Sequence, residues 1–351
     1  MPGSYLVLEL SNRCNLACVH CAVSEDAHPH YDRSGSIDLN IVYSLFSDLA
    51  QARLHFDTLI LFWLGEPLLH PHFQSIYQQA LRFAARDNIF SRIEVHTNAV
   101  RMDFNIIDAL LNSAPIPQSI HLSLDAATAD TYKTIKGKDQ FIAAARHSAF
   151  FFRTKVGRGA RWPRPVFQYI LGKNNLHEAV MFQKHWCDLG TELHTPVRVV
   201  AGHVPRGDDP IVFFRQKDCP TPEEQAQENT LFSNFAQQQK LSLPPKSKKE
   251  VPCTNLHPCS GFWKSPVIDW QGNLTFCTRD NTLENSVGNI QKTSFPDLWF
   301  SSTTQSFRER VAKGDYKDLS LCQSCFIPRS LNHTEISSDE IADFAAYERA
   351  L

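Results

Sequence analysis

The first two thirds of the chain are predicted to form an α/β unit in which helices cover a parallel sheet. Short apolar runs alternate with helical patterns over residues 4–200, which is typical of successive β-then-α units. Because crossovers between parallel strands are right-handed, six such units are expected to curl into an open or closed barrel. Functional residues are then expected at the C-terminal ends of the strands. The predicted strands are 4–10, 57–63, 91–96, 118–124, 165–171 and 194–200.

Helical periodicity is clearest in two stretches between the predicted strands. Their apolar residues recur every three or four positions, so each stretch presents one apolar face to the sheet. The first face contains Leu39, Val42, Leu45, Phe46 and Leu49, and the second contains Phe73, Ile76, Ala80, Leu81 and Ala84.

The composition of the 351 residues limits the class of protein. A hydrophobic content of 42% and a charged content of 21% are typical of a globular enzyme. The formal net charge of −2 gives no electrostatic case for a nucleic-acid partner, and no apolar run is long enough to span a membrane. Without a recognisable signal peptide, we expect a cytoplasmic location, where the ten cysteines favour metal binding over disulfides.

A loop with three cysteines follows the first predicted strand. Cys14, Cys18 and Cys21 have the spacing CxxxCxxC. Three thiolates on one short loop can hold three irons of a [4Fe–4S] cube and leave the fourth iron open for a ligand. The alternatives are a zinc knuckle or three unrelated buried thiols, although zinc usually takes four ligands in paired CxxC spacing.

This loop resembles the defining CxxxCxΦC motif of the radical SAM superfamily, with His20 at the usually aromatic Φ position. The resemblance implies a partial (β/α)6 TIM-like barrel and a cluster whose open iron is chelated by S-adenosylmethionine. It also implies reductive cleavage of this cofactor to a 5′-deoxyadenosyl radical, with electrons from a one-electron reductant such as a flavodoxin or ferredoxin. In such enzymes the protein binds, orients and shields, and the cofactor supplies the difficult chemistry.

Two later strand ends also resemble motifs of this superfamily. Leu64-Gly65-Glu66-Pro67 is similar to its GGEP motif, which implies that Glu66 accepts hydrogen bonds from the methionyl ammonium of the cofactor. The segment 96–99 is similar to its TNG ending, with Ala99 in place of glycine, and implies that Asn98 faces the cofactor. The alternative for both segments is an ordinary loop.

The fourth predicted strand ends in Ser123-Leu124-Asp125, which resembles the superfamily's SxD pattern. The resemblance implies that Ser123 and Asp125 bind the ribose and carboxylate groups of the cofactor, as carboxylates commonly bind ribose hydroxyls. The alternative is that Asp125 caps the helix that follows.

The C-terminal part contains a second group of four cysteines: Cys259, Cys277, Cys322 and Cys325. An Asp-x-x-Gly-Asn turn at 269–273 predicts a hairpin between the first two, and the last two form a CxxC knuckle. Four thiolates complete a coordination shell, so structural zinc is one interpretation. The pattern resembles the SPASM/twitch extension of radical SAM enzymes, which implies a second, auxiliary [4Fe–4S] cluster.

No cysteine follows Cys325, and this shortage matches the twitch form with a single auxiliary cluster. Cys253 is an alternative ligand to Cys259, which we prefer because Trp263 follows it at the expected distance. Cys187 and Cys219 have no partners at ligand spacing.

We therefore divide the chain into four segments: a barrel at 1–201, a bridging segment at 202–252, an auxiliary-cluster unit at 253–335 and a C-terminal helix at 336–351. Gly and Pro residues suggest the bridge, which includes a helical pattern from about Pro222 to Lys240. Ser337 or Ser338 is the expected cap of the last helix.

Two predicted clusters imply a two-electron oxidation in which the auxiliary cluster accepts an electron. The expected substrate is a small polyhydroxylated molecule, because the first strand begins at residue 4 or 5 and leaves no space upstream for a domain that binds a leader peptide. Modification of a peptide, by epimerisation or crosslinking, is the second hypothesis, and a non-catalytic iron–sulfur or zinc protein is the third. The catalytic base is not identifiable from the sequence.

Overall fold

The computed structural model describes residues 4–19, 21, 34–112, 116–219, 221–243, 256–325 and 336–350. Within these residues, one ten-stranded sheet runs through the molecule in the order β10-β9-β8-β1-β2-β3-β4-β5-β7-β6. Strands β1 to β7 are all parallel to their neighbours. Their bounds are Tyr5–Leu8, Phe56–Leu61, Phe90–Thr97, Gln118–Ser123, Arg164–Leu171, Arg198–Ala201 and Ile211–Gln216.

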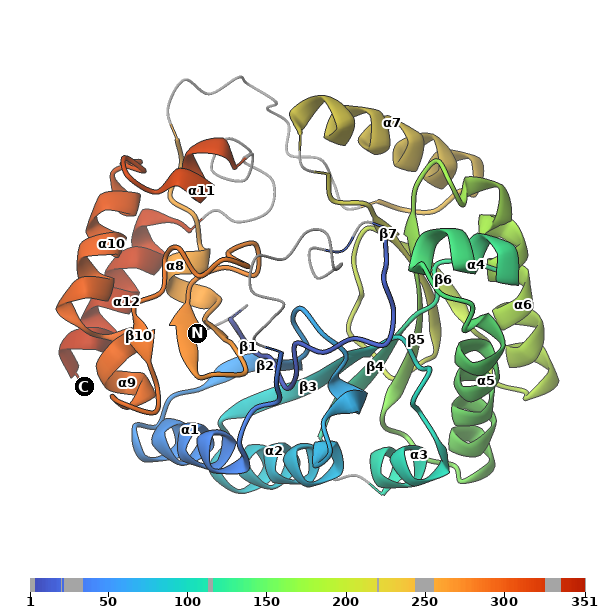
Figure 1. The fold of residues 1–351 in the computed structure, drawn as a ribbon, viewed down its shortest axis with the longest axis horizontal. Coiled ribbons are helices and arrows are strands. Elements are labelled where there is room, and N and C mark those ends of the chain that lie inside the picture. Colours follow the sequence, from blue (N-terminus) through green and yellow to red (C-terminus); the bar gives the residue numbers. More distant parts are fainter. Residues whose placement is uncertain are drawn as a thin grey trace.

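Helices cover the outer face of this curved sheet, as Figure 1 shows for α1, α2 and α3 along its lower edge and for α5 and α6 at its right. The arrangement confirms the predicted α/β class and the partial barrel. The helices are α1 (Leu39–Gln51), α2 (Phe73–Asp87), α3 (Phe104–Leu111), α4 (Ala129–Lys136), α5 (Phe141–Gly157), α6 (Ala179–Glu192) and α7 (Pro222–Gln238), with short 3-10 turns η2 (Pro67–Leu69) and η3 (Leu176–Glu178).

The apolar faces predicted for the first two helices pack against the sheet. In α1, Val42, Leu45, Phe46 and Leu49 are buried and Leu39 is half-buried, while all five predicted residues of α2 are buried. The Asp38 side chain caps α1 by accepting a hydrogen bond from the Asn40 amide at 2.7 Å. These helices therefore fix β1, β2 and β3, whose C-terminal ends carry the candidate site.

The structure corrects the prediction in the segment 202–252. Residues 211–216, interpreted as part of a bridge, form β7, which lies between β5 and β6 in the sheet. Ile211 to Phe214 are all buried, so this strand is a continuous apolar run without the alternation of a half-buried strand. The sixth predicted strand is also shorter than expected, because His194 adopts φ 52° after α6 and β6 begins only at Arg198.

The C-terminal part extends the same sheet. β8 (Val267–Ile268) pairs in parallel with β1 through Val7 and Leu8, and it pairs antiparallel with β9 (Asn273–Thr275). The predicted hairpin turn joins them, and Asp269 accepts hydrogen bonds from the amides of Gln271 and Asn273. The hairpin is therefore fixed directly beside the first barrel strand.

The remaining elements pack around this hairpin and form the orange and red part of Figure 1. Ser337 caps the last helix by accepting a hydrogen bond from the Glu340 amide at 3.1 Å. Among the described residues, no helix is both long and apolar enough to cross a membrane. The elements are α8 (Gly261–Lys264), β10 (Gly288–Asn289), α9 (Phe295–Trp299), α10 (Ser302–Ala312), α11 (Ser320–Ser324) and α12 (Ser338–Ala350).

Candidate active site

The loop with Cys14, Cys18 and Cys21 leaves the C-terminal end of β1, and all three cysteines are half-buried. Burial raises the pKa of the Cys14 thiol to about 12 and that of Cys18 to about 11. Such thiols become thiolates when a metal centre offsets their charge. Close by, the Asn15 side-chain nitrogen is buried and has no hydrogen-bond partner among the described residues. This donor set therefore fits an iron–sulfur cluster with a polar ligand beside it.

Helix α4 holds this loop from the side. The amides of Ala17 and Val19 donate hydrogen bonds to the carbonyls of Lys136 and Ile135, both at 3.0 Å. Gly137 follows the helix at φ 71°, and a Cβ atom there would lie 2.2 Å from the Ala17 carbonyl oxygen. Only glycine permits this close approach, so the helix end is part of the support of the cysteine loop.

Glu66 lies under the same loop and is 2% exposed. Its carboxylate accepts hydrogen bonds from the Leu68 amide, the Thr97 hydroxyl and the Asn98 amide at 3.0, 2.6 and 2.8 Å. Burial raises the pKa of Glu66 to about 7, although these hydrogen bonds act in the opposite direction. The preceding Gly65 packs so tightly that a Cβ would lie 2.0 Å from the Ser11 carbonyl oxygen. Glu66 therefore connects the strand ends of β2 and β3 beneath the cysteines.

Asn98 lies beside the cysteine loop. Its side-chain nitrogen donates a hydrogen bond to the Asn15 oxygen at 2.9 Å and lies 4.0 Å from the Cys14 sulfur. Its side-chain oxygen accepts from the Val100 amide at 3.0 Å. The position of Asn98 is compatible with the predicted contact to the cofactor.

Ser123 and Asp125 occupy different environments at the end of β4. Ser123 is half-buried and accepts a hydrogen bond from the Gln168 side chain at 3.2 Å. Asp125 is completely buried and adopts φ 59°. One carboxylate oxygen accepts from the Ile170 amide at 2.6 Å, and the other pairs with the Lys136 ammonium. The Asp125 carboxylate is thus occupied by protein groups and does not cap the helix that follows, whose cap is Thr128.

The Lys136 ammonium is a charged group that the sequence analysis missed. Burial lowers its pKa, but the charges of Asp125 and Cys18 outweigh burial and raise it above the usual lysine value. Lys136 therefore keeps a positive charge beside the cysteine loop. The sequence signal was a lysine in the last turn of a helix just before a glycine, which is common at exposed helix ends and does not reveal burial.

The segment that follows β5 supports Asp125 from the other side. Asn175 donates hydrogen bonds from its side-chain nitrogen to the carbonyls of Asp125 and Ile170, both at 2.9 Å. Glu178 accepts from the Thr131 hydroxyl at 2.7 Å and from the Ala127 amide at 2.8 Å. These contacts give Asn175 and Glu178 a structural role.

The second group of cysteines also comes together. Burial raises the pKa of both Cys277 and Cys322 to about 12, and each of them interacts electrostatically with Cys259 and Cys325. The Tyr316 hydroxyl accepts a hydrogen bond from the Cys259 amide at 2.9 Å and so fixes the start of α8. Four convergent, half-buried thiols fit an iron–sulfur cluster or zinc. Two earlier candidates, Cys253 and His20, lie outside the described residues.

Two side chains connect the auxiliary site to the barrel. The Trp63 indole nitrogen donates a hydrogen bond to the Thr278 carbonyl, next to Cys277, at 2.9 Å. The buried Glu9 carboxylate accepts from the Leu64 amide at 3.2 Å and from the Trp270 amide at 3.1 Å. The loop that contains Glu66 is therefore tied to the hairpin that positions the second group of cysteines.

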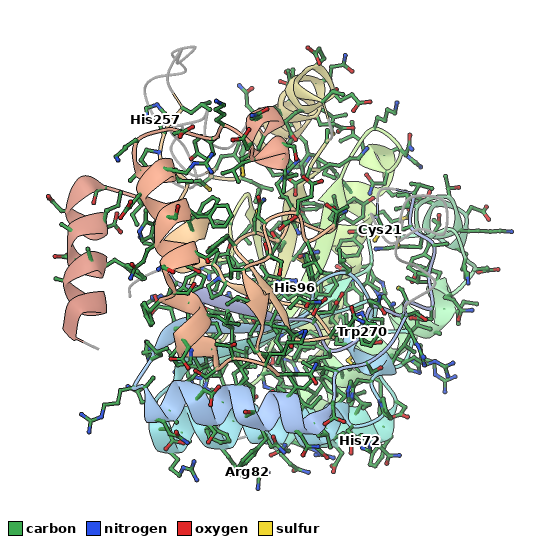
Figure 2. All side chains as sticks on the ribbon, turned by 60° about the vertical axis from the view of Figure 1, so that its left-hand side comes forward. Cys21, His72, Arg82, His96, His257 and Trp270 are labelled. Carbon is green, nitrogen blue, oxygen red and sulfur yellow. The ribbon has the colours of Figure 1, made fainter. Side chains whose placement is uncertain are left out.

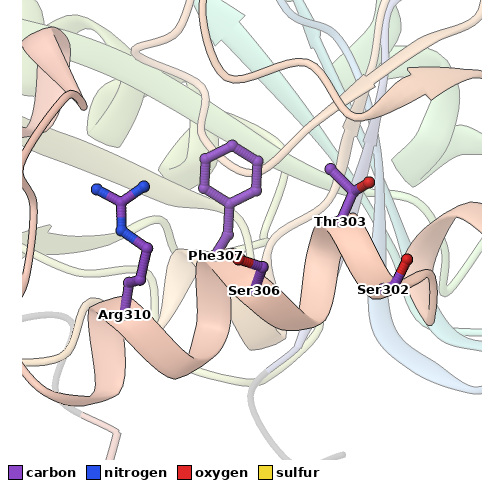
Figure 3. A pocket seen from close by; sticks show the side chains of 5 residues that line it. All are labelled: Ser302, Thr303, Ser306, Phe307 and Arg310. Atoms are coloured by element: carbon purple, nitrogen blue, oxygen red, sulfur yellow. The ribbon is translucent and has the colours of Figure 1, made fainter.

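Two histidines and a glutamate in the barrel interior were not predicted as site residues. Burial lowers the pKa of His121 on β4 to about 3, so its imidazole is neutral. Although burial raises the pKa of Glu94 on β3, interactions with His96 and with the Arg92 guanidinium lower it to about 2. Figure 2 shows His96 inside the molecule. By contrast, the hollow of about 360 Å³ in Figure 3 is formed by α10 residues such as Phe307 and Arg310, and none of the predicted ligands lines it.

Comparison with known proteins identifies the family. Residues 8–147 match the radical SAM superfamily, and residues 259–326 match SPASM, an iron–sulfur cluster-binding domain. A sequence relative is the mycofactocin maturase MftC of Mycobacterium ulcerans (strain Agy99), which is 26% identical over 141 residues. The match covers 40% of this chain and 34% of MftC, so it spans about a third of that relative's length.

Two solved proteins share the fold. The structure of anSMEcpe with bound AdoMet has a TM-score of 0.61 at 14% identity, and the match covers 99% of this chain and 97% of anSMEcpe. anSMEcpe has also been solved with AdoMet and the Cp18Cys peptide. BtrN in complex with AdoMet and 2-DOIA has a TM-score of 0.50 at 15% identity, with 92% of each chain covered.

The chain therefore contains a radical SAM domain at residues 8–147 and a SPASM domain at residues 259–326. It is therefore a radical SAM enzyme whose cofactors are a [4Fe–4S] cluster, S-adenosylmethionine and an auxiliary iron–sulfur cluster. The two groups of cysteines and the polar residues around the first group are the candidates that bind these cofactors.

Proposed function

We propose that the enzyme oxidises a small polyhydroxylated molecule by two electrons, that is, by dehydrogenation. The observation that carries the proposal is the four-cysteine site joined to the barrel by β1–β8 pairing and by Trp63 and Glu9. An oxidation that starts from a carbon radical needs an electron acceptor, and this site is fixed against the strand ends where the substrate would bind. The BtrN complex with AdoMet and 2-DOIA supports a small ligand in this fold.

We assign Cys14, Cys18 and Cys21 to the first cluster and Cys259, Cys277, Cys322 and Cys325 to the auxiliary cluster. The bound first cluster and S-adenosylmethionine supply a 5′-deoxyadenosyl radical, for which the electron comes from a reductant such as flavodoxin or ferredoxin. Asn98, which is buried beside Asn15 on the cysteine loop, and the half-buried Ser123 offer polar side chains to the cofactor.

Glu66 and Asp125 act differently in this proposal. Glu66 has one carboxylate oxygen that accepts only a single protein hydrogen bond, so it retains acceptor capacity for the methionyl ammonium. Asp125 is completely buried and its charge is paired with the Lys136 ammonium, so it positions Lys136 instead of binding ribose directly. The Lys136 charge beside Cys18 then favours a carboxylate of the cofactor at this edge.

Peptide modification is the second candidate, supported by the match to the maturase MftC and by the fold shared with anSMEcpe, which has been solved with a peptide. Both candidates need two clusters but differ in the molecule that loses a hydrogen atom.

The test is anaerobic reconstitution followed by iron and sulfide analysis and by assays with dithionite and S-adenosylmethionine. We expect about eight irons per chain and release of 5′-deoxyadenosine. A panel of deuterated cyclitols and amino sugars is then compared with deuterated peptides, and deuterium in 5′-deoxyadenosine identifies the substrate class. Transfer from peptides alone would contradict the proposed dehydrogenation of a small molecule.

A further inference from the structure

Three potential ligand side chains share the inner face of two neighbouring strands. Glu94 and His96 are two residues apart on β3, so both side chains point to the same face, and His121 on β4 is the direct cross-strand neighbour of His96. The Glu94 Oε2 atom lies 3.6 Å from His96 Nε2 and 3.7 Å from His121 Nε2. One ligand atom from each of the three residues lies within 4.8 Å of the other two.

Apart from the long ion-pair contacts with Glu94, three nitrogens of these histidines have no hydrogen-bond partner among the described residues. His121 is 3% exposed, and neither of its ring nitrogens has a hydrogen-bond partner among the described residues. The same holds for the buried Nε2 atom of His96. Folded proteins satisfy nearly all buried polar atoms, so three such nitrogens at one place indicate a bound group that is not part of the chain.

The surroundings isolate this group inside the barrel. Phe62 stacks on the outer face of His96 at a centroid distance of 5.5 Å. Val7 and Ile60 lie on the β1–β2 side, and a second apolar cluster with Val166 and Phe213 lies on the β5–β7 side. The Arg92 guanidinium lies 3.6 Å from the other Glu94 oxygen, Oε1, and leaves Oε2 facing the histidines. A polar centre flanked by apolar side chains is typical of a ligand or metal site.

We propose that Glu94, His96 and His121 bind a divalent transition-metal ion inside the barrel. Two imidazoles and one carboxylate are a common set of protein ligands for catalytic zinc and for non-haem iron, and they leave further coordination positions open. Tetrahedral zinc with bonds of about 2.0–2.1 Å separates its ligand atoms by about 3.4 Å, close to both measured oxygen–nitrogen distances.

Binding requires one ring to turn. The two imidazoles are stacked at a centroid distance of 4.0 Å with an interplanar angle of 4°, so their nitrogen lone pairs lie in nearly parallel planes and do not converge on one point. Rotation about the broad χ2 torsion of histidine lets the lone pairs converge on one ion. His96, with a side chain that is 16% exposed, is the ring that faces more open space.

The site is distinct from both cysteine clusters. His96 and His121 each lie two residues before a predicted cofactor contact, Asn98 and Ser123, which places them about 6.6 Å deeper along the strands. The open positions of the ion would face the space below the cofactor, where they suit a hydroxyl or carbonyl oxygen of a substrate. Metal binding itself does not depend on the proposed dehydrogenation.

The experiment adds Zn²⁺ to the anaerobically reconstituted enzyme, whose cysteines are already occupied by clusters. After desalting, zinc and iron are counted, and the zinc ligands are identified by X-ray absorption. We expect one zinc per chain with nitrogen and oxygen neighbours at about 2.0–2.1 Å, whereas zinc in a cysteine site has sulfur at about 2.3 Å. His121→Phe should abolish this zinc, and Glu94→Gln should weaken its binding about tenfold or more.

The control is His203→Phe, which changes an exposed loop histidine and should bind zinc like the unmodified enzyme. Iron content and circular dichroism show whether each variant is folded. If His121→Phe does not fold, Glu94→Gln takes its place as the test of the metal site. Three results overturn the proposal: no zinc beyond the clusters, zinc with sulfur neighbours, or zinc binding that neither ligand substitution changes. If no zinc bound beyond the clusters, the two histidines would instead be groups that form hydrogen bonds with the substrate or accept a proton from it.

Discussion

The Lys136 ammonium forms an ion pair with the Asp125 carboxylate, and both side chains are almost completely buried. The pair joins the C-terminal end of α4 to the exit of β4, directly beside the loop that carries Cys18. Because each charge is shielded from water, each depends on the other for compensation.

Replacing Lys136 alone is expected to destabilise the protein strongly. Lys136→Met leaves the Asp125 carboxylate buried and uncompensated, which should lower the free energy of unfolding by about 3–5 kcal/mol. The double variant Lys136→Met/Asp125→Asn removes both charges and should recover part of this loss. Urea unfolding of the three proteins without clusters measures the difference. Equal stability of the single and double variants would show that the charge of Asp125 is compensated elsewhere.

Gly137 allows a prediction about the cysteine loop with a well-matched control. Gly137→Ala places a Cβ 2.2 Å from the Ala17 carbonyl oxygen, so we expect displacement of the loop and loss of the first cluster, from about eight to about four irons per chain. Gly159→Ala imposes a similar strain, since Gly159 has φ 59°, but its Cβ would meet no atom within 4 Å. Both variants should lose about 1 kcal/mol or more of stability from the backbone strain alone.

Iron analysis and cleavage of S-adenosylmethionine distinguish the two variants. Gly159→Ala should retain both clusters and cofactor cleavage, whereas Gly137→Ala should lose cleavage together with iron. If both variants retained about eight irons, the contact between α4 and the loop would not be needed for cluster binding.

The pH dependence of stability should contain a contribution from Glu9. Burial raises the pKa of Glu9 to about 8 in the folded state, above its ordinary value of 4.5. The folded state therefore binds more protons than the unfolded state between these values, and stability should fall as the pH rises from about 4.5 to 8, by at most about 1.4 kcal/mol per pH unit. Unfolding of the cluster-free protein at several pH values measures this slope.

Glu9→Gln is the matched variant, because its side chain has the same size but does not titrate. Its stability should change less with pH than that of the unmodified protein, although loss of one acceptor for the Leu64 or Trp270 amide lowers stability at every pH. Identical pH profiles would mean that Glu9 keeps an ordinary pKa in the folded protein.

The parts of the site that the sequence predicted are those encoded by local spacing. Cys14, Cys18 and Cys21 lie within eight residues, and the turn from Asp269 to Asn273 has a chemistry that defines a hairpin without any knowledge of the rest of the fold. The helical faces of α1 and α2 were predicted for the same reason, because a period near 3.6 is a local property.

The parts that were missed depend on contacts between distant residues. Glu9 meets the Trp270 amide across 261 positions, and Glu94, His96 and His121 form a cluster only once the register of β3 and β4 is known. The sequence contained a Glu-x-His pair on one strand and a histidine on the next strand. Without the register of the two strands, the sequence does not show whether these side chains lie next to one another. β7 was missed because its short apolar run lies in a segment punctuated by Gly207, Pro210 and Pro220, which favoured the interpretation as a bridge.

The independence of the two cysteine sites leads to a prediction about Cys322. Cys322→Ala removes one of the four convergent thiols around Cys277, so the auxiliary cluster should be lost and the iron content should fall from about eight to about four per chain. The first cluster lies on the β1 loop and keeps its three cysteines, so reductive cleavage of S-adenosylmethionine should persist while oxidation of the substrate fails.

Cys187→Ala is the control, because this half-buried cysteine of α6 lies in neither group and its sulfur donates a hydrogen bond to the Val197 carbonyl at 3.7 Å. It should leave iron content, cofactor cleavage and product formation unchanged. Loss of cofactor cleavage in Cys322→Ala would show that the auxiliary site supports the first cluster through the Trp63 and Glu9 contacts. Retention of about eight irons would instead exclude Cys322 as a ligand and turn attention to Cys253.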